Sequence, residues 1–221
     1  MSGARRALIS TILAAAALLA ATVPVEAQEQ GTWRYGFRAI HVGLDTPSDP
    51  VFESDSTIAI DSAVFAEYDM TYMLGENWGM EWMITASPHD AQVESGIYDG
   101  LDLGSLWIAE TTITFNYMLP FWNRWKPYLG AGASAAYFFG SDPSSAAEAI
   151  GVDKLTSDVG WGFVGQLGLA YRLNRSWILS LDVKWITMPM TVKLEGDTGD
   201  VAEVDMDLDP LIIGFGGAVR F

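Results

Sequence analysis

The C-terminal stretch "DPLIIGFGGAVRF", residues 209–221, alternates between two kinds of side chain. Large apolar residues fill every second position on most of one side: Leu211, Ile213, Phe215, Val219 and Phe221. Gly214, Gly216 and Arg220 fall between them. Because successive side chains of a strand point to opposite faces, the stretch predicts a strand with one apolar face and one small or charged face, ending on an aromatic ring.

Seven further segments show the same period of two. They span residues 32–44, 58–73, 78–87, 106–119, 127–139, 161–173 and 177–188. In 177–188, for example, Trp177, Leu179, Leu181 and Trp185 alternate with Ser180, Asp182 and Lys184. No repeat or low-complexity linker divides these segments, so we expect one domain of eight strands.

A soluble sandwich and a membrane barrel both have such strands, and two features favour the barrel. Trp and Tyr gather near strand ends, as in the aromatic girdles of membrane barrels. The connections alternate between short turns ("LGEN", "PFWNRWK", "NRS") and long segments at 45–57, 88–105, 140–160 and 189–208. We therefore predict an all-β fold, an eight-stranded antiparallel transmembrane up-and-down β-barrel.

A barrel in hydrocarbon cannot leave an unpaired strand edge, because no water satisfies its backbone groups. The last strand must then pair with the first, placing Leu211, Ile213 and Phe215 against lipid and Arg220 inside. Eight strands enclose room only for side chains or a small ligand, which excludes a wide aqueous pore.

The N-terminus predicts export. Arg5 and Arg6 precede the apolar run "ALISTILAAAALLAATV", and "VEA" forms a small-x-small cleavage site. We expect a secretory signal peptide, 1–27, to be removed from a mature barrel, 28–221. An uncleaved membrane anchor is the alternative. The chain has no cysteine, so disulfides do not stabilise it.

Four motifs carry a resemblance to a known family. They are "YMLGENWGMEWMITASPHD" (72–90), "KPYLGAGASAAYFF" (126–139), "WGFVGQLGLAYRLNRSWILSLDVKW" (161–185) and "LDPLIIGFGGAVRF" (208–221). In this order they resemble the OmpW family of small outer-membrane proteins. The resemblance implies an eight-stranded barrel with a narrow, largely hydrophobic channel that passes small apolar or amphiphilic molecules. This sequence departs from the family pattern at Lys184, where relatives often carry an apolar or aromatic residue.

Alternation places several side chains inside the barrel. The charged ones are Arg34, Arg38, Glu67, Asp69, Glu81, Glu110, Asp182, Lys184 and Arg220, and the apolar ones include Phe65, Met83 and Phe138. The charges suit either a paired plug or a polar filter, because an unpaired charge there would be very costly. We expect Arg220 to pair with a carboxylate. The apolar residues suit either simple filling or a conduit for apolar solutes.

The charge balance constrains partners. The chain carries 28 Asp and Glu against 12 Lys and Arg, and most of the acidic residues fall in the long connections. This negative net charge excludes nucleic acid as a partner. The acidic side chains could instead be bridged to lipid phosphates by divalent ions. The simpler interpretation is that charge keeps the loops soluble. A calcium site at "DVAEVDMDLD" (200–209) is an alternative without a recognised loop motif.

No catalytic, metal or cofactor motif is present. His41 and His89 fall near strand ends, with Ser87 and Asp90 beside His89, but without a nucleophile signature. A lipid-modifying enzyme is thus a weak third possibility, and we predict no enzyme, no cofactor and no metal site.

The sequence therefore predicts an outer-membrane channel of a Gram-negative bacterium for passive passage of small hydrophobic or amphiphilic molecules. Phe65, Met83 and Phe138 would contact the solute, and Asp182, Lys184 and Arg220 would set the polarity of the path. Expected partners are outer-membrane lipids and lipopolysaccharide, small apolar solutes, and the barrel-assembly machinery during biogenesis. The rival is a non-conducting structural or adhesive barrel that displays acidic loops.

Overall fold

The computed structural model describes residues 30–44, 46, 48–52, 55–120, 124–197 and 199–221. The expected signal peptide, 1–27, lies outside the described residues. No helix in the described part of the chain is long and apolar enough to span a membrane.

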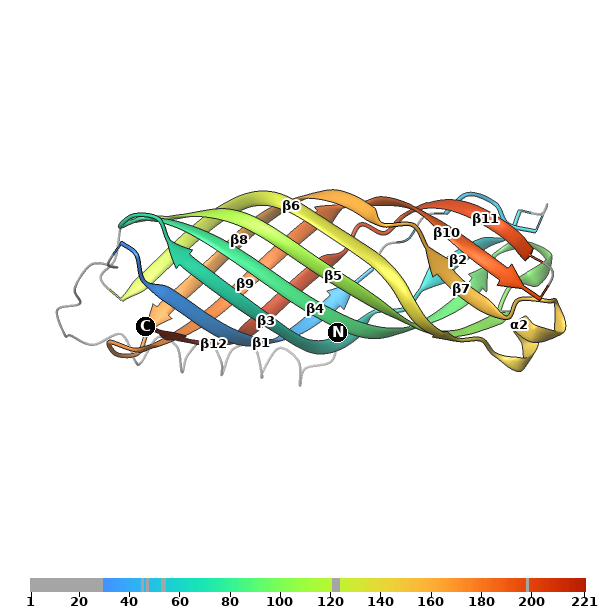
Figure 1. Ribbon diagram of the computed structural model, residues 1–221, viewed down its shortest axis with the longest axis horizontal. Coiled ribbons are helices and arrows are strands. Elements are labelled where there is room, and N and C mark those ends of the chain that lie inside the picture. Colours follow the sequence, from blue (N-terminus) through green and yellow to red (C-terminus); the bar gives the residue numbers. More distant parts are fainter. Residues whose placement is uncertain (1–29, 45, 47, 53–54, 121–123, 198) are drawn as a thin grey trace, which may run out of the picture.

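Eight antiparallel strands close into a barrel (Figure 1). They are β1 (Trp33–Gly43), β3 (Ala63–Met73), β4 (Trp78–Glu94), β5 (Asp102–Met118), β6 (Trp125–Asp142), β8 (Gly160–Arg172), β9 (Trp177–Thr187) and β12 (Leu211–Arg220). Each pairs with the next, and β12 pairs with β1 to close the ring. The predicted fold and its closure by the last strand are confirmed.

The closure extends to the last residue. The N–H of Phe221 donates to the carbonyl of Trp33 at 2.9 Å, and the N–H of Trp33 donates to the carbonyl of Phe221 at 3.1 Å. The ladder of β1 and β12 therefore leaves no free edge at this end, as hydrocarbon requires.

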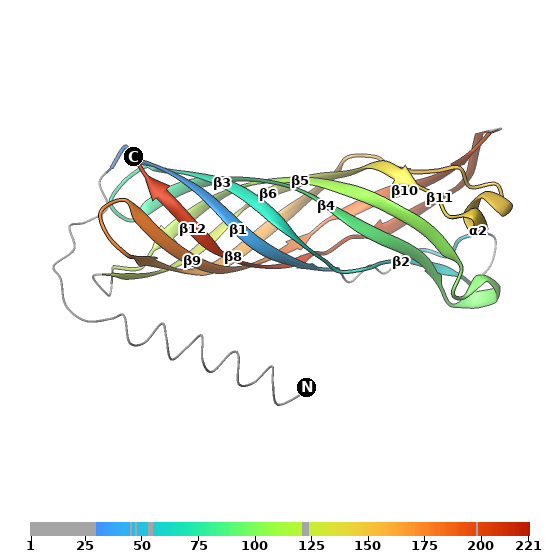
Figure 2. The ribbon, with the colours of Figure 1, turned by 90° about the horizontal axis from the view of Figure 1, so that it is seen from below.

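The long connections contain regular elements that the period-two pattern did not indicate. They contain β2 (Thr57–Ile60), β7 (Lys154–Ser157), β10 (Pro189–Gly196), β11 (Gly199–Asp207), a short 3-10 helix η1 (Gly96–Tyr98) and the helix α2 (Ser145–Ala149). β7, β10 and β11 form a separate sheet, and β2 pairs with the end of β4. Figure 2 shows these elements gathered at the end of the barrel opposite the C-terminus.

Two aromatic zones surround the barrel, as predicted. Near the short turns, Trp78 contacts Tyr117 and Trp125 contacts Tyr171, with ring centroids 4.9 and 4.5 Å apart. The other zone lies toward the long connections, where Trp107 stands 6.2 Å from Phe139. Between the zones the outer face is apolar, and short turns mark the periplasmic end of such a barrel.

Candidate functional site: a divided lumen beside a gap in the wall

A network of charges, here called the plug, closes the middle of the lumen. Its members are Arg38, Glu67, Asp69, Glu81, Asp182 and Lys184, all 5% exposed or less. Arg38 binds Glu67 at 2.7 Å, Glu81 at 3.1 Å and Asp69 at 3.3 Å, and it also binds Asp182. Lys184 lies 3.3 Å from Glu67, 3.6 Å from Asp182 and 3.7 Å from Glu81. The expected paired plug is therefore present, and it holds the inner face of four strands together.

Neutral side chains complete the plug, and sequence reasoning gave them no role. Tyr128 donates its hydroxyl to Asp182 at 3.0 Å. The amide of Gln166 donates to Glu81 at 3.2 Å and to Asp182 at 3.3 Å, and its oxygen accepts from Thr114 at 3.1 Å. Their inward position follows from strand alternation, but their partners lie on distant strands. Buried charges need such additional hydrogen bonds to offset desolvation.

Outward from the plug the lumen is apolar. A continuous cluster of buried side chains, here called the outer apolar cluster, includes Ile40, Ile108, Phe138, Val164 and Ile212. Met83 is fully buried on β4, between the plug residue Glu81 and Thr85. Beyond Met83 the inward face of β4 is still polar at Thr85, Ser87 and His89, so the outer apolar cluster is built mainly from the other strands.

The wall of the barrel is incomplete at this level. The ladder of β3 and β4 runs from Met73 opposite Gly79 to Glu67 opposite Thr85. Beyond it, residues 63–66 of β3 face residues 86–89 of β4 without pairing, until β2 takes up β4 at Ala91. We call this the β3–β4 gap. Unpaired backbone at membrane depth is tolerated only where it borders protein or a cavity.

Side chains bridge the gap in place of the backbone. Thr85 donates its hydroxyl to the carbonyl of Ala66 at 3.0 Å. The ring of His89 joins the carbonyl of Asp61 at 2.7 Å and the hydroxyl of Ser87 at 2.8 Å. Since a carbonyl can only accept, Nδ1 of His89 carries the proton and Nε2 accepts from Ser87. No sequence pattern indicated this bridge.

Phe65 lies at the gap and not inside the lumen, which corrects the expected position. It is 38% exposed, and its ring meets Trp107 edge-on at 5.6 Å. Alternation turns residue 65 to the same side as Glu67, and Phe65 stands opposite Ile40 in the β1 ladder, but on its other side no β4 residue pairs with it, which leaves the ring at the open edge. The other five predicted channel residues fall inside: Met83, Phe138, Asp182 and Lys184 are buried, and Arg220 is half-buried.

Arg220 does not meet a carboxylate, contrary to expectation. Within the described residues its side chain forms no ion pair, and buried Nη1 has no hydrogen-bond partner. Its cross-strand neighbour on β1 is Arg34. The carboxylates lie one level further in, at Asp69 and Glu81, where Arg38 binds them.

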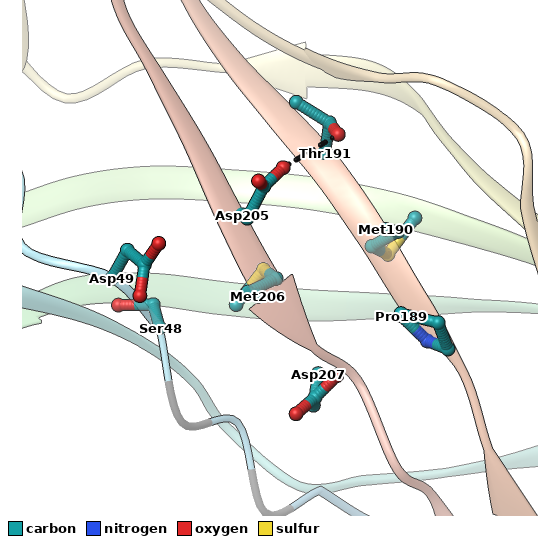
Figure 3. A pocket seen from close by; sticks show the side chains of 8 residues that line it. All are labelled: Ser48, Asp49, Pro189, Met190, Thr191, Asp205, Met206 and Asp207. Carbon is teal, nitrogen blue, oxygen red and sulfur yellow. Dashed lines mark hydrogen bonds between the residues drawn. The ribbon is translucent and has the colours of Figure 1, made fainter.

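A separate cavity of about 480 Å³ lies outside the barrel, between β10, β11 and the segment after β1 (Figure 3). Asp49, Asp205 and Asp207 border it, and Thr191 donates to Asp205 at 2.8 Å. Across the part of the chain that the structure describes, no three His, Cys, Asp or Glu residues are placed to hold a metal. The calcium alternative at 200–209 gains no support.

A closed eight-stranded barrel with an apolar outer belt, two aromatic zones and a filled lumen defines a small outer-membrane barrel protein. The chain belongs to the OmpW family, whose pattern matches residues 38–221. It is 26% identical over 214 residues to outer membrane protein W of Vibrio cholerae, covering 93% of this chain and 96% of that protein. It is 24% identical to the dibenzothiophene metabolism operon protein PahQ of Pseudomonas aeruginosa, covering 83% and 86%.

Solved structures repeat the fold. The outer membrane protein OprG of Pseudomonas aeruginosa superposes with a TM-score of 0.80 at 24% identity, covering 89% of this chain and 99% of that one. With its membership of the OmpW family, the protein resides in the bacterial outer membrane and contacts its lipids, as predicted.

Proposed function

We propose that this protein lets small hydrophobic or amphiphilic solutes pass the outer leaflet passively, entering from outside and leaving sideways through the β3–β4 gap. The observation that carries the proposal is the position of the gap. It opens beside the outer apolar cluster, directly outward of the plug.

The entrance would lie at the outer end. A groove of about 420 Å³ runs between the segment after β1 and β2, bordered by Leu44, Ile58 and Ile60. It continues to Asp61 and Ser62, where the gap begins. An apolar solute would follow this groove to Phe138 and Met83 by displacing side chains, since apolar transfer out of water favours such contact at about 25 cal/mol per Å².

The plug argues against a straight path to the periplasm. An apolar molecule passing there would have to separate Arg38 and Lys184 from their carboxylates, leaving charges buried and unpaired. Breaking such a pair typically costs about 3–5 kcal/mol. Leaving through the gap separates no ion pair, and Phe65 and Trp107 offer an apolar border on the lipid side. Asp182, Lys184 and Arg220 would then form a polar floor rather than the path itself.

The name of one relative is consistent with this class of solute. The related PahQ is called a dibenzothiophene metabolism operon protein, and dibenzothiophene is a flat apolar polycycle. Lipopolysaccharide around the barrel and the assembly machinery during biogenesis remain expected partners on general grounds.

A reversible crosslink tests the exit. The chain has no cysteine, so a pair can be introduced cleanly. Ala66→Cys with Ala86→Cys would extend the register of Glu67 and Thr85 across the gap. The control, Ala86→Cys with Ala109→Cys, joins the same β4 residue to its partner in the intact β4–β5 ladder. The readout is transfer of an apolar fluorescent dye into liposomes that contain the folded barrel.

We expect oxidation to slow transfer several-fold in the gap pair, with recovery on reduction, and to leave the control pair unchanged. Equal transfer through the oxidised and reduced gap pair would overturn the sideways exit. If the cysteine-free protein itself gave no transfer above empty liposomes, the non-conducting structural barrel would replace the channel.

A further inference from the structure

The periplasmic end of the lumen gathers positive charge. Arg34 of β1, Lys126 of β6, Arg172 of β8 and Arg220 of β12 share the inward face of their strands, near the short turns. We call this set the periplasmic mouth. Arg34 stands directly opposite Arg220, and Arg172, Glu81 and Arg220 all lie within its electrostatic reach, although Glu81 forms no ion pair with it among the described residues. Four cations on one inner rim repel one another unless something offsets their charge.

The surroundings of the Arg34 guanidinium leave room in its hydrogen bonding for an anionic partner. The residue is 5% exposed, and among the described residues its Nη2 donates to the sulfur atoms of Met73 at 2.9 Å and Met118 at 3.3 Å and to nothing else. Thioether sulfur is a weak acceptor. Within the part of the chain that the structure describes, Nε of Arg34 and Nη1 of Arg220 are buried without a hydrogen-bond partner. A buried cation normally meets an anion, because desolvation is costly.

The other cations of the lumen contrast with this arrangement. Arg38 and Lys184, further in, are surrounded by four carboxylates. In the described residues neither Arg34 nor Arg220 forms an ion pair. The lumen therefore has a negatively charged middle and a positively charged periplasmic end.

We propose that the periplasmic mouth binds a small soluble oxyanion, a carboxylate or phosphate group, from the periplasmic side. Arg34 and Arg220 would donate to it from the neighbouring strands β1 and β12, and Arg172 and Lys126 would add long-range attraction. Guanidinium groups match the planar and forked geometry of such anions. Because all four side chains lie on the inner face, the ligand comes from solution and not from the surrounding lipid.

The same geometry sets where the anion stops. Between Arg34 and the plug there is a cavity of only about 30 Å³, which is room for about one water. Asp69 and Glu81 border its far side and would repel an anion. The mouth thus holds an anion without conducting it, and this site is independent of the sideways exit of apolar solutes.

The test is calorimetric titration of inorganic phosphate into the folded barrel in an uncharged detergent, at constant ionic strength. Arg34→Gln and Arg220→Gln should each weaken binding about tenfold or more, the usual loss for one charge-assisted hydrogen bond. Arg175→Gln is the matched control, because Arg175 is exposed in the turn at the same end. It should bind as the unchanged protein does.

Each other outcome overturns the site. No binding of phosphate to the unchanged barrel removes it. An equal loss of phosphate affinity in Arg34→Gln, Arg220→Gln and Arg175→Gln would mean that phosphate responds to the overall positive charge of this end and not to a defined site. If the barrel bound no phosphate from solution but bound an anionic phospholipid in bicelles, the ligand would be a lipid headgroup and not a soluble anion. If Arg34→Gln does not fold, Arg34→Met replaces it, because a methionine side chain fits beside Met73 and Met118. This variant should give a folded barrel that does not bind phosphate.

Discussion

In the middle of the barrel, Nε of Arg38 lies 2.7 Å from a carboxylate oxygen of Glu67, and both side chains are almost completely buried. The two residues stand directly opposite each other on β1 and β3. The same guanidinium also reaches carboxylates on β4 and β9. One side chain thus ties together strands that lie far apart in the sequence.

Removing this guanidinium should destabilise the barrel strongly. Arg38→Met would leave several carboxylates without their main partner, and we expect a loss of about 3–5 kcal/mol in the free energy of unfolding. Urea unfolding in lipid vesicles would measure it. The control is Lys154→Met, which removes an exposed pair with Glu195 at 3.8 Å and should cost less than about 1 kcal/mol. Similar losses in both variants would contradict the plug.

A charge at the boundary between the plug and the outer apolar cluster should block apolar solutes without unfolding the barrel. Met83→Arg introduces a cation opposite Asp69, beside a plug in which four carboxylates meet Arg38 and Lys184. We expect a folded, heat-modifiable barrel with several-fold slower dye transfer. Met83→Leu, close in volume, should transfer as before. Unchanged transfer in Met83→Arg would remove Met83 from the path.

Loss of the His89 bridge should loosen the gap. His89→Ala deletes the bond to Asp61, which crosses from β4 to the segment before β3, and the bond to Ser87 within β4. We expect faster transfer of bulky apolar dyes and a loss of about 1 kcal/mol in stability. His41→Ala, an exposed histidine on β1, should change neither. If the unchanged protein hydrolysed phospholipid and His89→Ala did not, Ser87 and His89 would instead be catalytic.

A methyl group at Gly168 of β8 should disturb the plug through Tyr128 on the neighbouring strand β6. A Cβ atom there would collide with the ring of Tyr128, whose hydroxyl donates to Asp182. Gly168→Ala should therefore lower the unfolding midpoint of the barrel. Gly75→Ala is the control, because a Cβ in that turn meets nothing within 4 Å. Equal midpoints for the two variants would contradict the contact.

Much of the fold was predictable because its cause is local. Alternation in 209–221 and 177–188 fixes two faces for each strand, and hydrocarbon allows only a closed sheet. Closure of β12 on β1 follows from that rule alone. The strands β2, β7, β10 and β11 could not be predicted in the same way. They lie beyond the apolar belt, where a strand needs no lipid-facing apolar residue at every second position.

Apart from Phe65, the sequence by itself determined which of the predicted side chains face lipid and which face the lumen, because the pleat assigns faces one residue at a time. Only the tertiary structure decided which lumenal charges meet. Arg38 and Asp182 are 144 residues apart, and their contact depends on the stagger of strands around the ring. The position of Phe65 and the isolation of Arg34 and Arg220 from carboxylates have the same origin. Where a ladder stops, and which level of the barrel each inward residue occupies, are properties of the assembled wall.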